Sequence, residues 1–378
     1  MRLAIIKSNY TPFGGAEKYT TRLVKAFADL GIEVDLLAAG HGEWGDCPQN
    51  VRTIELSQFR YNNLLRTLSF NSSVRAYLRK QHYDCILGLD RTDYQTHLRL
   101  GGGCHASWLA RRSVESTPFR RLSFRLNPFH IATVNLEKRA LREKRLKTIF
   151  CNSNMVRNEI AHYYPESSSK AVVVHNGVQW NEFELAFNQR AEQRESILKN
   201  FNLDQDKFFF LFTGSGYERK GLLKAIKAMP LLPSHTELLV VGKDKDEGWY
   251  KEFCNKIGLA GRVHFFGPQR DIIPFLQIAD AFVLPTLYDP FSNASIEALA
   301  MGLFTITSKA NGCSEVIRDG DGFIIEDLQD IDSVAEAMRG ALGQHADKET
   351  IRKSVSNLDF EIQLKKIVDV CIEDTSGN

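Results

Sequence analysis

Two acidic residues near position 290 stand where a strand gives way to a helix. The apolar run 281–284 predicts a buried strand, and Ser292 and Asn293 are residue types that cap helix N-termini. Asp289 precedes this cap, and Glu297 follows it by about one turn. Because a helix start presents free N–H groups and partial positive charge, the pattern predicts a phosphate site beside two carboxylates that can accept hydroxyl hydrogen bonds. A capped helix with two solvated acids is the plainer alternative.

A glycine-rich loop in the same half of the chain offers cations for such a phosphate. The apolar run 208–212 predicts a strand, and Gly214-Ser215-Gly216 comes shortly after it. Arg219 and Lys220 follow, and this pair suits a pyrophosphate because Arg binds as a planar fork and Lys as a point charge.

A glycine pair, Gly14-Gly15, follows the first predicted strand, 3–6, and precedes a predicted helix. The pair lets the backbone turn sharply and approach a ligand, although a plain tight turn would need the same residues. The third glycine of a dinucleotide fingerprint is missing, which argues against NAD.

A glycine triplet at 101–103 precedes His105 and could hold this histidine at a cleft, the alternative being a mobile linker with an exposed histidine. Cys104 and His105 have no suitably spaced partner ligands, so no metal site is predicted. The seven cysteines are scattered and form no CxxC pair, which favours reduced structural thiols in the cytosol.

Strand and helix patterns alternate twice along the 378 residues, which predicts two doubly wound α/β domains with ligands at the carboxyl ends of their strands. Predicted strands are 3–6, 32–37, 84–89, 148–154, 171–174, 208–212, 237–241, 263–268 and 281–284. We place the domains at 1–180 and 181–355. A final helix within 356–378 is expected to pack back against the first domain.

The two halves differ in charge. Residues 1–180 contain 26 Lys and Arg against 15 Asp and Glu, whereas the whole chain has a net charge of only +2. The segment 111–147 is the most basic, and its first half is interleaved with aromatic and aliphatic residues, namely Phe119, Leu122, Phe124, Leu126 and Phe129. Such a segment suits an anionic membrane surface, whereas a solvated helix face is the alternative for 134–147. No nucleic-acid motif is present, and no apolar run approaches the roughly 20 residues of a membrane span.

The motifs and their order resemble the GT-B fold glycosyltransferases of family 4, which are retaining enzymes that use nucleotide-sugar donors. The matching stretches are Pro12 to Glu17, His175 to Val178, Gly214 to Gly221, Val240 to Gly242, Val263 to Gly267 and Asp289 to Gly302. The similarity covers nearly the whole chain and is strongest to lipopolysaccharide core glucosyltransferases. It implies two Rossmann-like doubly wound domains that face a cleft.

The resemblance also implies the residues that surround the nucleotide-sugar donor, most of them in the second domain. These are Gly14, Gly15, Arg219, Lys220, Asn293, Ala294, Ser295 and Glu297. The two cations and the helix N–H groups would bind the diphosphate, and Glu297 would bind the ribose hydroxyls. Because fixed positive groups can stabilise the departing diphosphate, no metal or other cofactor is expected.

The resemblance also implies that two residues take part in catalysis. Asp289 would bind the sugar hydroxyls, and His105 would lie near the reacting sugar. Asp289 is one methylene shorter than the glutamate that is usual in the family. Relatives often carry an acid shortly before the histidine, where this chain has Gly102 and Gly103. A replacement could come from the nearby acids, namely Asp90 and Asp93.

The sequence thus predicts a cytoplasmic retaining glycosyltransferase, peripheral at the inner membrane. It would move a hexose, with glucose favoured, from a nucleotide donor such as UDP-glucose to a phosphorylated lipopolysaccharide-core or other lipid-linked glycan. A nucleotide-sugar 2-epimerase of the same fold and a non-catalytic nucleotide-sugar-binding protein are the alternatives.

Overall fold

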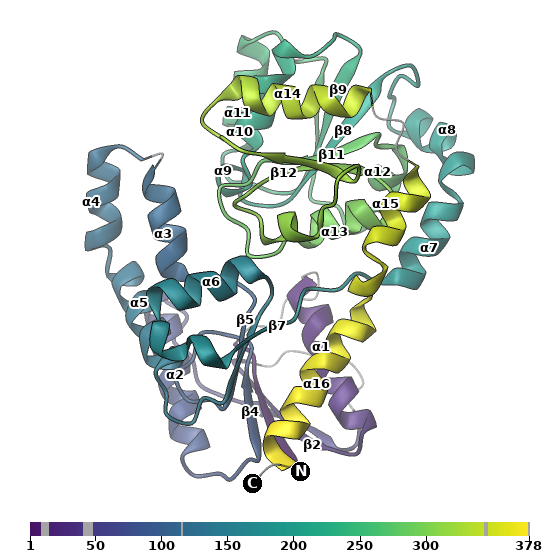
Figure 1. The fold of residues 1–378 in the computed structure, drawn as a ribbon. Helices are drawn as coiled ribbons and strands as arrows, with labels where there is room; N and C mark the ends of the chain where they lie inside the picture. The colour runs from purple at the N-terminus through teal and green to yellow at the C-terminus, as the bar shows by residue number, and fades with distance from the viewer. Residues whose placement is uncertain (9–14, 41–47, 115, 344–346, 377–378) are drawn as a thin grey trace. The chain divides into compact units, whose positions relative to one another are not determined.

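The computed structural model describes residues 1–8, 15–40, 48–114, 116–343 and 347–376. The chain forms two compact units, the first of residues 1–175 with 363–378 and the second of residues 176–362 (Figure 1). The boundary precedes the predicted position 180, because Asn176 and Val178 already bond to the second unit. The Asn176 side chain donates to the Phe291 carbonyl at 3.0 Å, and the Val178 N–H donates to the Leu358 carbonyl at 2.8 Å.

The first unit contains a sheet of parallel strands in the order β3-β2-β1-β4-β5-β6-β7. The strands are β1 (Arg2–Ile6), β2 (Glu33–Ala38), β3 (Val51–Glu55), β4 (Cys85–Gly88), β5 (His97–Leu100), β6 (Thr148–Cys151) and β7 (Ala171–Val173). β4 and β6 are buried along their whole length, as expected for a parallel sheet with both faces covered.

The helices of the first unit include four with side-chain caps at their N-termini, provided by Asn62, Thr117, Asn127 and Ser153. The helices are α1 (Gly15–Asp29), α2 (Asn63–Leu78), α3 (His105–Val114), α4 (Pro118–Leu126), α5 (Pro128–Leu141) and α6 (Asn154–Tyr163). A 3-10 turn, η1 (Pro165–Lys170), follows α6.

The final helix, α16 (Phe360–Ser376), starts in the second unit, and its residues from Gln363 belong to the first. Leu364, Ile367, Val368 and Cys371 are buried at the spacing of one helix face, and this stripe packs the helix onto the first unit (Figure 1).

The second unit contains a parallel sheet in the order β10-β9-β8-β11-β12-β13. Its strands are β8 (Phe208–Thr213), β9 (Thr236–Val241), β10 (Val263–Gly267), β11 (Ala281–Leu284), β12 (Phe304–Ser308) and β13 (Gly322–Ile325). Its helices are α7 (Trp180–Asn188), α8 (Arg190–Asn200), α9 (Tyr217–Lys220), α10 (Leu222–Ala228), α11 (Glu247–Lys256), α12 (Ile273–Ile278), α13 (Asn293–Ala300), α14 (Ile331–Leu342) and α15 (Lys348–Ser354). β8 and β11 are neighbours, which brings the segments after them to one edge of the sheet.

Candidate active site

The N-terminus of α13 is built by a buried polar cluster. Ser292 is the cap, and its hydroxyl accepts a hydrogen bond from the Ser295 N–H at 3.3 Å. The fully buried Asn311 accepts from the Ser292 N–H at 3.2 Å and donates to the Ser295 hydroxyl at 3.1 Å. Asn293 is exposed at the first turn, and Ala294 is half-buried. The hydrogen bonds of Ser292 and Asn311 therefore fix the first turn of α13.

Asp289 is paired with both predicted phosphate-binding cations. It is only 6% exposed, and its carboxylate accepts a hydrogen bond from the Lys220 ammonium. An Arg219 guanidinium nitrogen lies 3.8 Å from the same carboxylate oxygen and donates to the Tyr288 carbonyl at 3.0 Å. Asp289 is thus close enough to contact both cations.

The short helix α9, which carries the two cations, is hydrogen-bonded to the segment that follows β11. The Leu287 N–H and the Thr286 hydroxyl each donate to the Arg219 carbonyl at 2.8 Å. Gly221 has φ +78°, and a Cβ on it would lie 1.8 Å from the Pro285 carbonyl oxygen. Only glycine permits this approach, which brings α9 beside Asp289.

The predicted donor-binding residues of the second unit therefore gather at one place, on the loop after β8 and the first turns of α13. Glu297 is half-buried on the second turn of that helix. Gly15 begins α1 in the first unit, and Gly14 lies outside the described residues.

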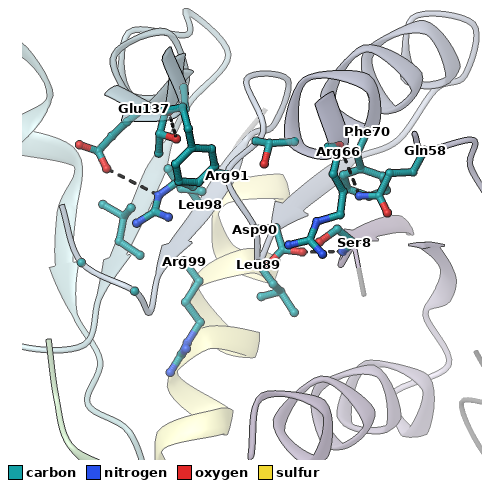
Figure 2. A pocket seen from close by; sticks show the side chains of 17 residues that line it. Ser8, Gln58, Arg66, Phe70, Leu89, Asp90, Arg91, Leu98, Arg99 and Glu137 are labelled. Carbon is teal, nitrogen blue, oxygen red and sulfur yellow. Dashed lines mark hydrogen bonds and ion pairs between the residues drawn. The ribbon is translucent and has the colours of Figure 1, made fainter. Parts of the chain in front are cut away.

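The first unit has a cavity of about 240 Å³ at the carboxyl ends of its strands (Figure 2). Three arginines line it, Arg66 from α2, Arg91 after β4 and Arg99 from β5. Two carboxylates, Asp90 and Glu137, lie on its wall with them. The cavity can therefore accept an anionic group and also offers carboxylate oxygens to hydroxyl groups.

His105 begins α3 and is 7% exposed, so it is neither a linker residue nor freely accessible. Its N–H donates to Glu137 Oε2 at 2.7 Å, and its ring Nε2 lies 3.0 Å from His130 Nδ1. The ring packs edge-on against Phe129, which lines the cavity. His105 is thus not one of the residues that line the cavity, but it contacts Glu137 and Phe129, which do, and can position both.

Glu137 is the buried acid that sequence reasoning missed. Burial raises the pKa of its carboxyl, which accepts hydrogen bonds from the His105 N–H and, at 2.8 Å, from the Tyr164 hydroxyl. Arg91 Nε is 3.8 Å away. Lys138 and Arg139 follow it directly in α5, and only the fold shows that Glu137 points inwards.

The two acids that could replace the missing carboxylate differ in placement. Asp90 lines the cavity, and its Oδ1 accepts from Lys7 Nζ at 3.2 Å. Asp93 is 2% exposed and pairs with Arg75 at 3.4 Å and Arg139 at 3.1 Å, outside the lining of this cavity. Asp90 is therefore the better placed of the two to meet a bound ligand.

The His105 ring is expected to stay neutral at physiological pH. Burial, with Arg91 and His130 nearby, lowers its pKa from 6.5 to about 3. Between these values the unfolded chain binds a proton that the folded chain does not, so this group's contribution to stability is complete above pH 6.5 and is lost as pH falls towards 3. An NMR titration of the ring, assigned with His105→Gln, checks this. A titration midpoint between pH 6 and 7 would contradict it.

Comparisons with known proteins show the family of this chain. Residues 13–181 match the family model described as Glycosyltransferase Family 4, and residues 193–356 match the model for Glycosyl transferases group 1. Together the two models span most of both units, and the chain belongs to the family 4 glycosyltransferases of GT-B fold.

Within this class the chain resembles lipopolysaccharide core enzymes. It is 23% identical over 354 residues to the lipopolysaccharide glucosyltransferase WaaG of Escherichia coli K12, covering 91% of this chain and 90% of that one. A crystal structure of WaaG superposes with a TM-score of 0.79 at 22% identity, covering 98% and 99% of the two chains. The Anabaena protein HepE in complex with UDP-glucose gives a TM-score of 0.71 at 15% identity, covering 99% and 100%.

Proposed function

We propose that this glycosyltransferase transfers a hexose, with glucose favoured, from a UDP-linked donor to a phosphorylated lipopolysaccharide-core or other lipid-linked glycan, with retention of configuration. The pairing of Arg219 and Lys220 with Asp289 beside the N-terminus of α13 is the observation that carries the proposal. It places cations, helix N–H groups and a carboxylate within one site. The names of WaaG and of the HepE complex support glucose and UDP as the starting choices.

In the proposed reaction an acceptor hydroxyl oxygen bonds to the anomeric carbon of the sugar as the bond from that carbon to the diphosphate breaks. The hydroxyl proton passes to a phosphate oxygen or a nearby carboxylate. Negative charge gathers on the diphosphate, where Arg219, Lys220 and the N–H group of Ala294 stabilise it. The Ser295 N–H already donates to the Ser292 hydroxyl, so Ser295 supports this helix turn. In this proposal Glu297 binds the ribose and Asp289 the sugar, while Gly14, Gly15 and Asn293 complete the donor contacts.

The arginine-lined cavity of the first unit is the proposed acceptor site. A phosphorylated core sugar presents phosphate to Arg66, Arg91 and Arg99, and its hydroxyls to Asp90 and Glu137. His105 acts here as a positioning residue, because its N–H holds the Glu137 carboxylate.

We expect Arg66→Gln to raise the KM for a phosphorylated acceptor by about 10-fold or more, since a hydrogen bond to a charged group contributes about 1.5–3 kcal/mol. Arg79→Gln is the matched control, because Arg79 follows the same helix but is exposed and outside the cavity lining. The measurement is initial rate against acceptor concentration. An equal loss with a dephosphorylated acceptor would show that Arg66 does not bind the phosphate.

The helix α4 is the proposed contact with an anionic membrane. Every residue of α4 is at least partly exposed, and Phe119, Leu122 and Leu126 are exposed by 87%, 53% and 66%. They recur at helical spacing, with Arg120 and Arg125 beside them. An exposed apolar stripe with basic flanks suits the headgroup region of an anionic bilayer. Among the described residues, no helix combines the length and the apolar character that crossing a bilayer requires.

Several basic and aromatic residues of α4 also contact the protein itself, and Arg120 is one of them, with its guanidinium carbon 6.0 Å from the centroid of the Phe124 ring. Phe124 is half-buried against Arg112 and His130, and Arg121 donates to the Ser116 carbonyl at 2.9 Å. The charge reversal Arg120→Glu with Arg125→Glu tests the surface and leaves the hydrogen bond from Arg121 to the Ser116 carbonyl in place.

We expect this double reversal to remove most binding to vesicles that contain phosphatidylglycerol, because each basic residue near such a surface contributes about 1 kcal/mol. Lys227→Glu with Lys245→Glu, at two exposed lysines of the second unit, is the control of equal charge change. Sedimentation with the vesicles is the measurement, and equal loss in both variants would argue against a specific role of α4.

The function itself is tested by incubating the protein with UDP-glucose and other nucleotide sugars, with and without phosphorylated core oligosaccharide. Acceptor-dependent release of UDP and a glucosylated product with retained anomeric configuration are expected. Epimerised donor formed without acceptor, or binding of every donor without turnover, would contradict the proposal.

A further inference from the structure

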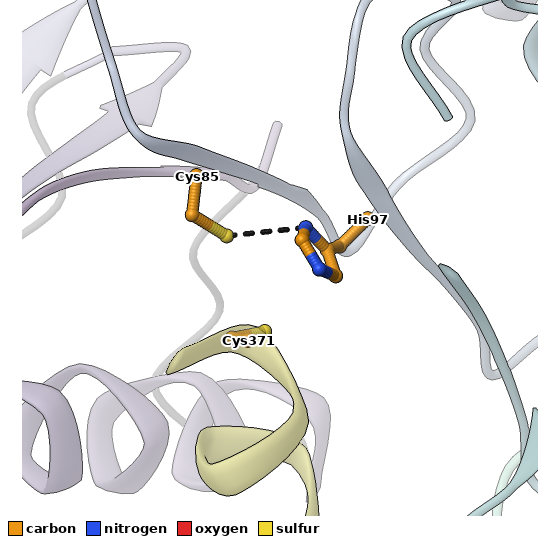
Figure 3. Close-up of side chains that lie close together, drawn as sticks. All are labelled: Cys85, His97 and Cys371. Carbon is orange, nitrogen blue, oxygen red and sulfur yellow. Dashed lines mark hydrogen bonds between the residues drawn. The ribbon is translucent and has the colours of Figure 1, made fainter. Parts of the chain in front are cut away.

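Three residues far apart in the sequence meet in the interior of the first unit, outside both proposed substrate sites. Cys85 begins β4, His97 begins β5 and Cys371 lies on α16 (Figure 3). The two sulfur atoms and a ring nitrogen lie within 4.8 Å of one another, and each residue is fully buried. Cys85 Sγ is 3.2 Å from His97 Nδ1.

The strand register explains this meeting. His97 is paired with Leu87, two residues after Cys85, so the side chains of Cys85 and His97 project from the same face of the sheet. The buried stripe of α16 includes Cys371. Because Cys85 and His97 begin their strands, the cluster lies towards the opposite edge of the sheet from the arginine-lined cavity. The cluster is therefore better placed to stabilise the fold than to take part in sugar transfer.

The second nitrogen of His97 is fixed in the way that metal-binding histidines usually are. His97 Nε2 lies 3.0 Å from Asp374 Oδ2, and the Thr148 hydroxyl donates to the same oxygen at 2.6 Å. Asp374 and Cys371 share one face of α16, three residues apart. A carboxylate on the far nitrogen sets the ring tautomer and orientation, and leaves Nδ1 directed towards the sulfur atom of Cys85.

We propose that Cys85, His97 and Cys371 form a zinc site that fastens α16 to the sheet. Two thiolates and one imidazole are a ligand set that zinc prefers. Tetrahedral zinc, with bonds of about 2.0–2.3 Å, needs ligand atoms roughly 3.5–3.8 Å apart, so small side-chain shifts suffice. The Thr96 hydroxyl, 2.9 Å from His97 Nδ1, borders the same space. Binding releases the thiol protons to solvent.

Cobalt provides a direct test on the reduced, chelator-treated full-length protein. Co²⁺ should bind at one equivalent with thiolate-to-metal charge-transfer absorption, and Zn²⁺ should abolish this absorption by displacement. The absorption should be largely lost in Cys371→Ser and retained in Cys254→Ser, a buried cysteine of the second unit. Asp374→Asn is expected to weaken zinc affinity by about 10–100-fold, because it changes the carboxylate on His97.

A second measurement on the unaltered protein covers the case in which Cys371→Ser fails to fold. Zinc should protect Cys85 and Cys371, but not Cys254, from alkylation in urea concentrations that loosen the fold, as read by mass spectrometry. The proposal is overturned if the reduced wild-type protein shows no thiolate–cobalt absorption. Full absorption in folded Cys371→Ser, or zinc protection that does not distinguish these cysteines, would overturn it equally.

Discussion

Replacing Lys220 by methionine is expected to lower kcat/KM with the nucleotide-sugar donor by about 10²–10³-fold. The ammonium group is one of the fixed positive groups proposed to face the departing diphosphate, and losing one such group costs about this much. The change also leaves Asp289 as a nearly buried carboxylate without its closest partner, because the cation that remains beside it among the described residues is the more distant Arg219. Breaking a buried ion pair costs up to about 3–5 kcal/mol of stability.

A double variant separates these two effects. Adding Asp289→Asn to Lys220→Met removes the unpaired charge, so stability in urea should recover while turnover of UDP-glucose stays low. Lys227→Met, at an exposed lysine of α10, loses the same charge in the same unit and should keep both properties. Recovery of activity together with stability in the double variant would show that Lys220 supports the fold and not the reaction.

Gly221→Ala is expected to destabilise the second unit by roughly 3 kcal/mol or more. The added Cβ would combine strain at φ +78° with a contact of 1.8 Å to the Pro285 carbonyl oxygen, and neither backbone segment can move without displacing β11 or α9. The shift should also carry Arg219 and Lys220 away from Asp289, so the donor should no longer raise the unfolding midpoint.

Gly216→Ala is the matched control for this change. Gly216 has nearly the same backbone angle, φ +79°, yet a Cβ there meets no atom of the described chain within 4 Å. Only the conformational strain remains, at about 1–2 kcal/mol. Urea unfolding followed by circular dichroism, with and without UDP-glucose, measures the difference. Equal midpoints for the two variants would mean that the approach to Pro285 does not constrain the loop.

Much of the donor region could be predicted from local sequence. The apolar runs before Gly214 and before Asp289 predict strands of an α/β domain, and the structure confirms both strands. That they are neighbours in the parallel sheet is shown by the structure alone. The start of α13 could also be predicted, because Ser292 is a capping residue type followed by good helix formers. In the structure Ser292 is the N-cap of this helix. These features depend on neighbours within a few residues.

The cavity of the first unit was harder to predict because its residues carry misleading local signals. The short strand β5 lies next to the glycine triplet, and nothing in the sequence marks His97 to Leu100 as buried. Glu137 sits among basic residues on a helix, a pattern that predicts a solvated face. Long-range packing of that helix against α3 turned its carboxylate inwards, onto the N–H of His105.

The sequence by itself therefore determined the α/β fold, the family and the strands and helix cap around the proposed donor site, because periodicity, glycines and caps act over one or two turns. Only the tertiary structure decided which side chains meet although they are distant in the sequence. It paired Lys220 with Asp289, buried His105 behind a cavity of arginines, and joined Cys85 and His97 to Cys371 at the end of the chain. Strand order and helix docking set these contacts, and neither leaves a mark on the spacing of residues along the chain.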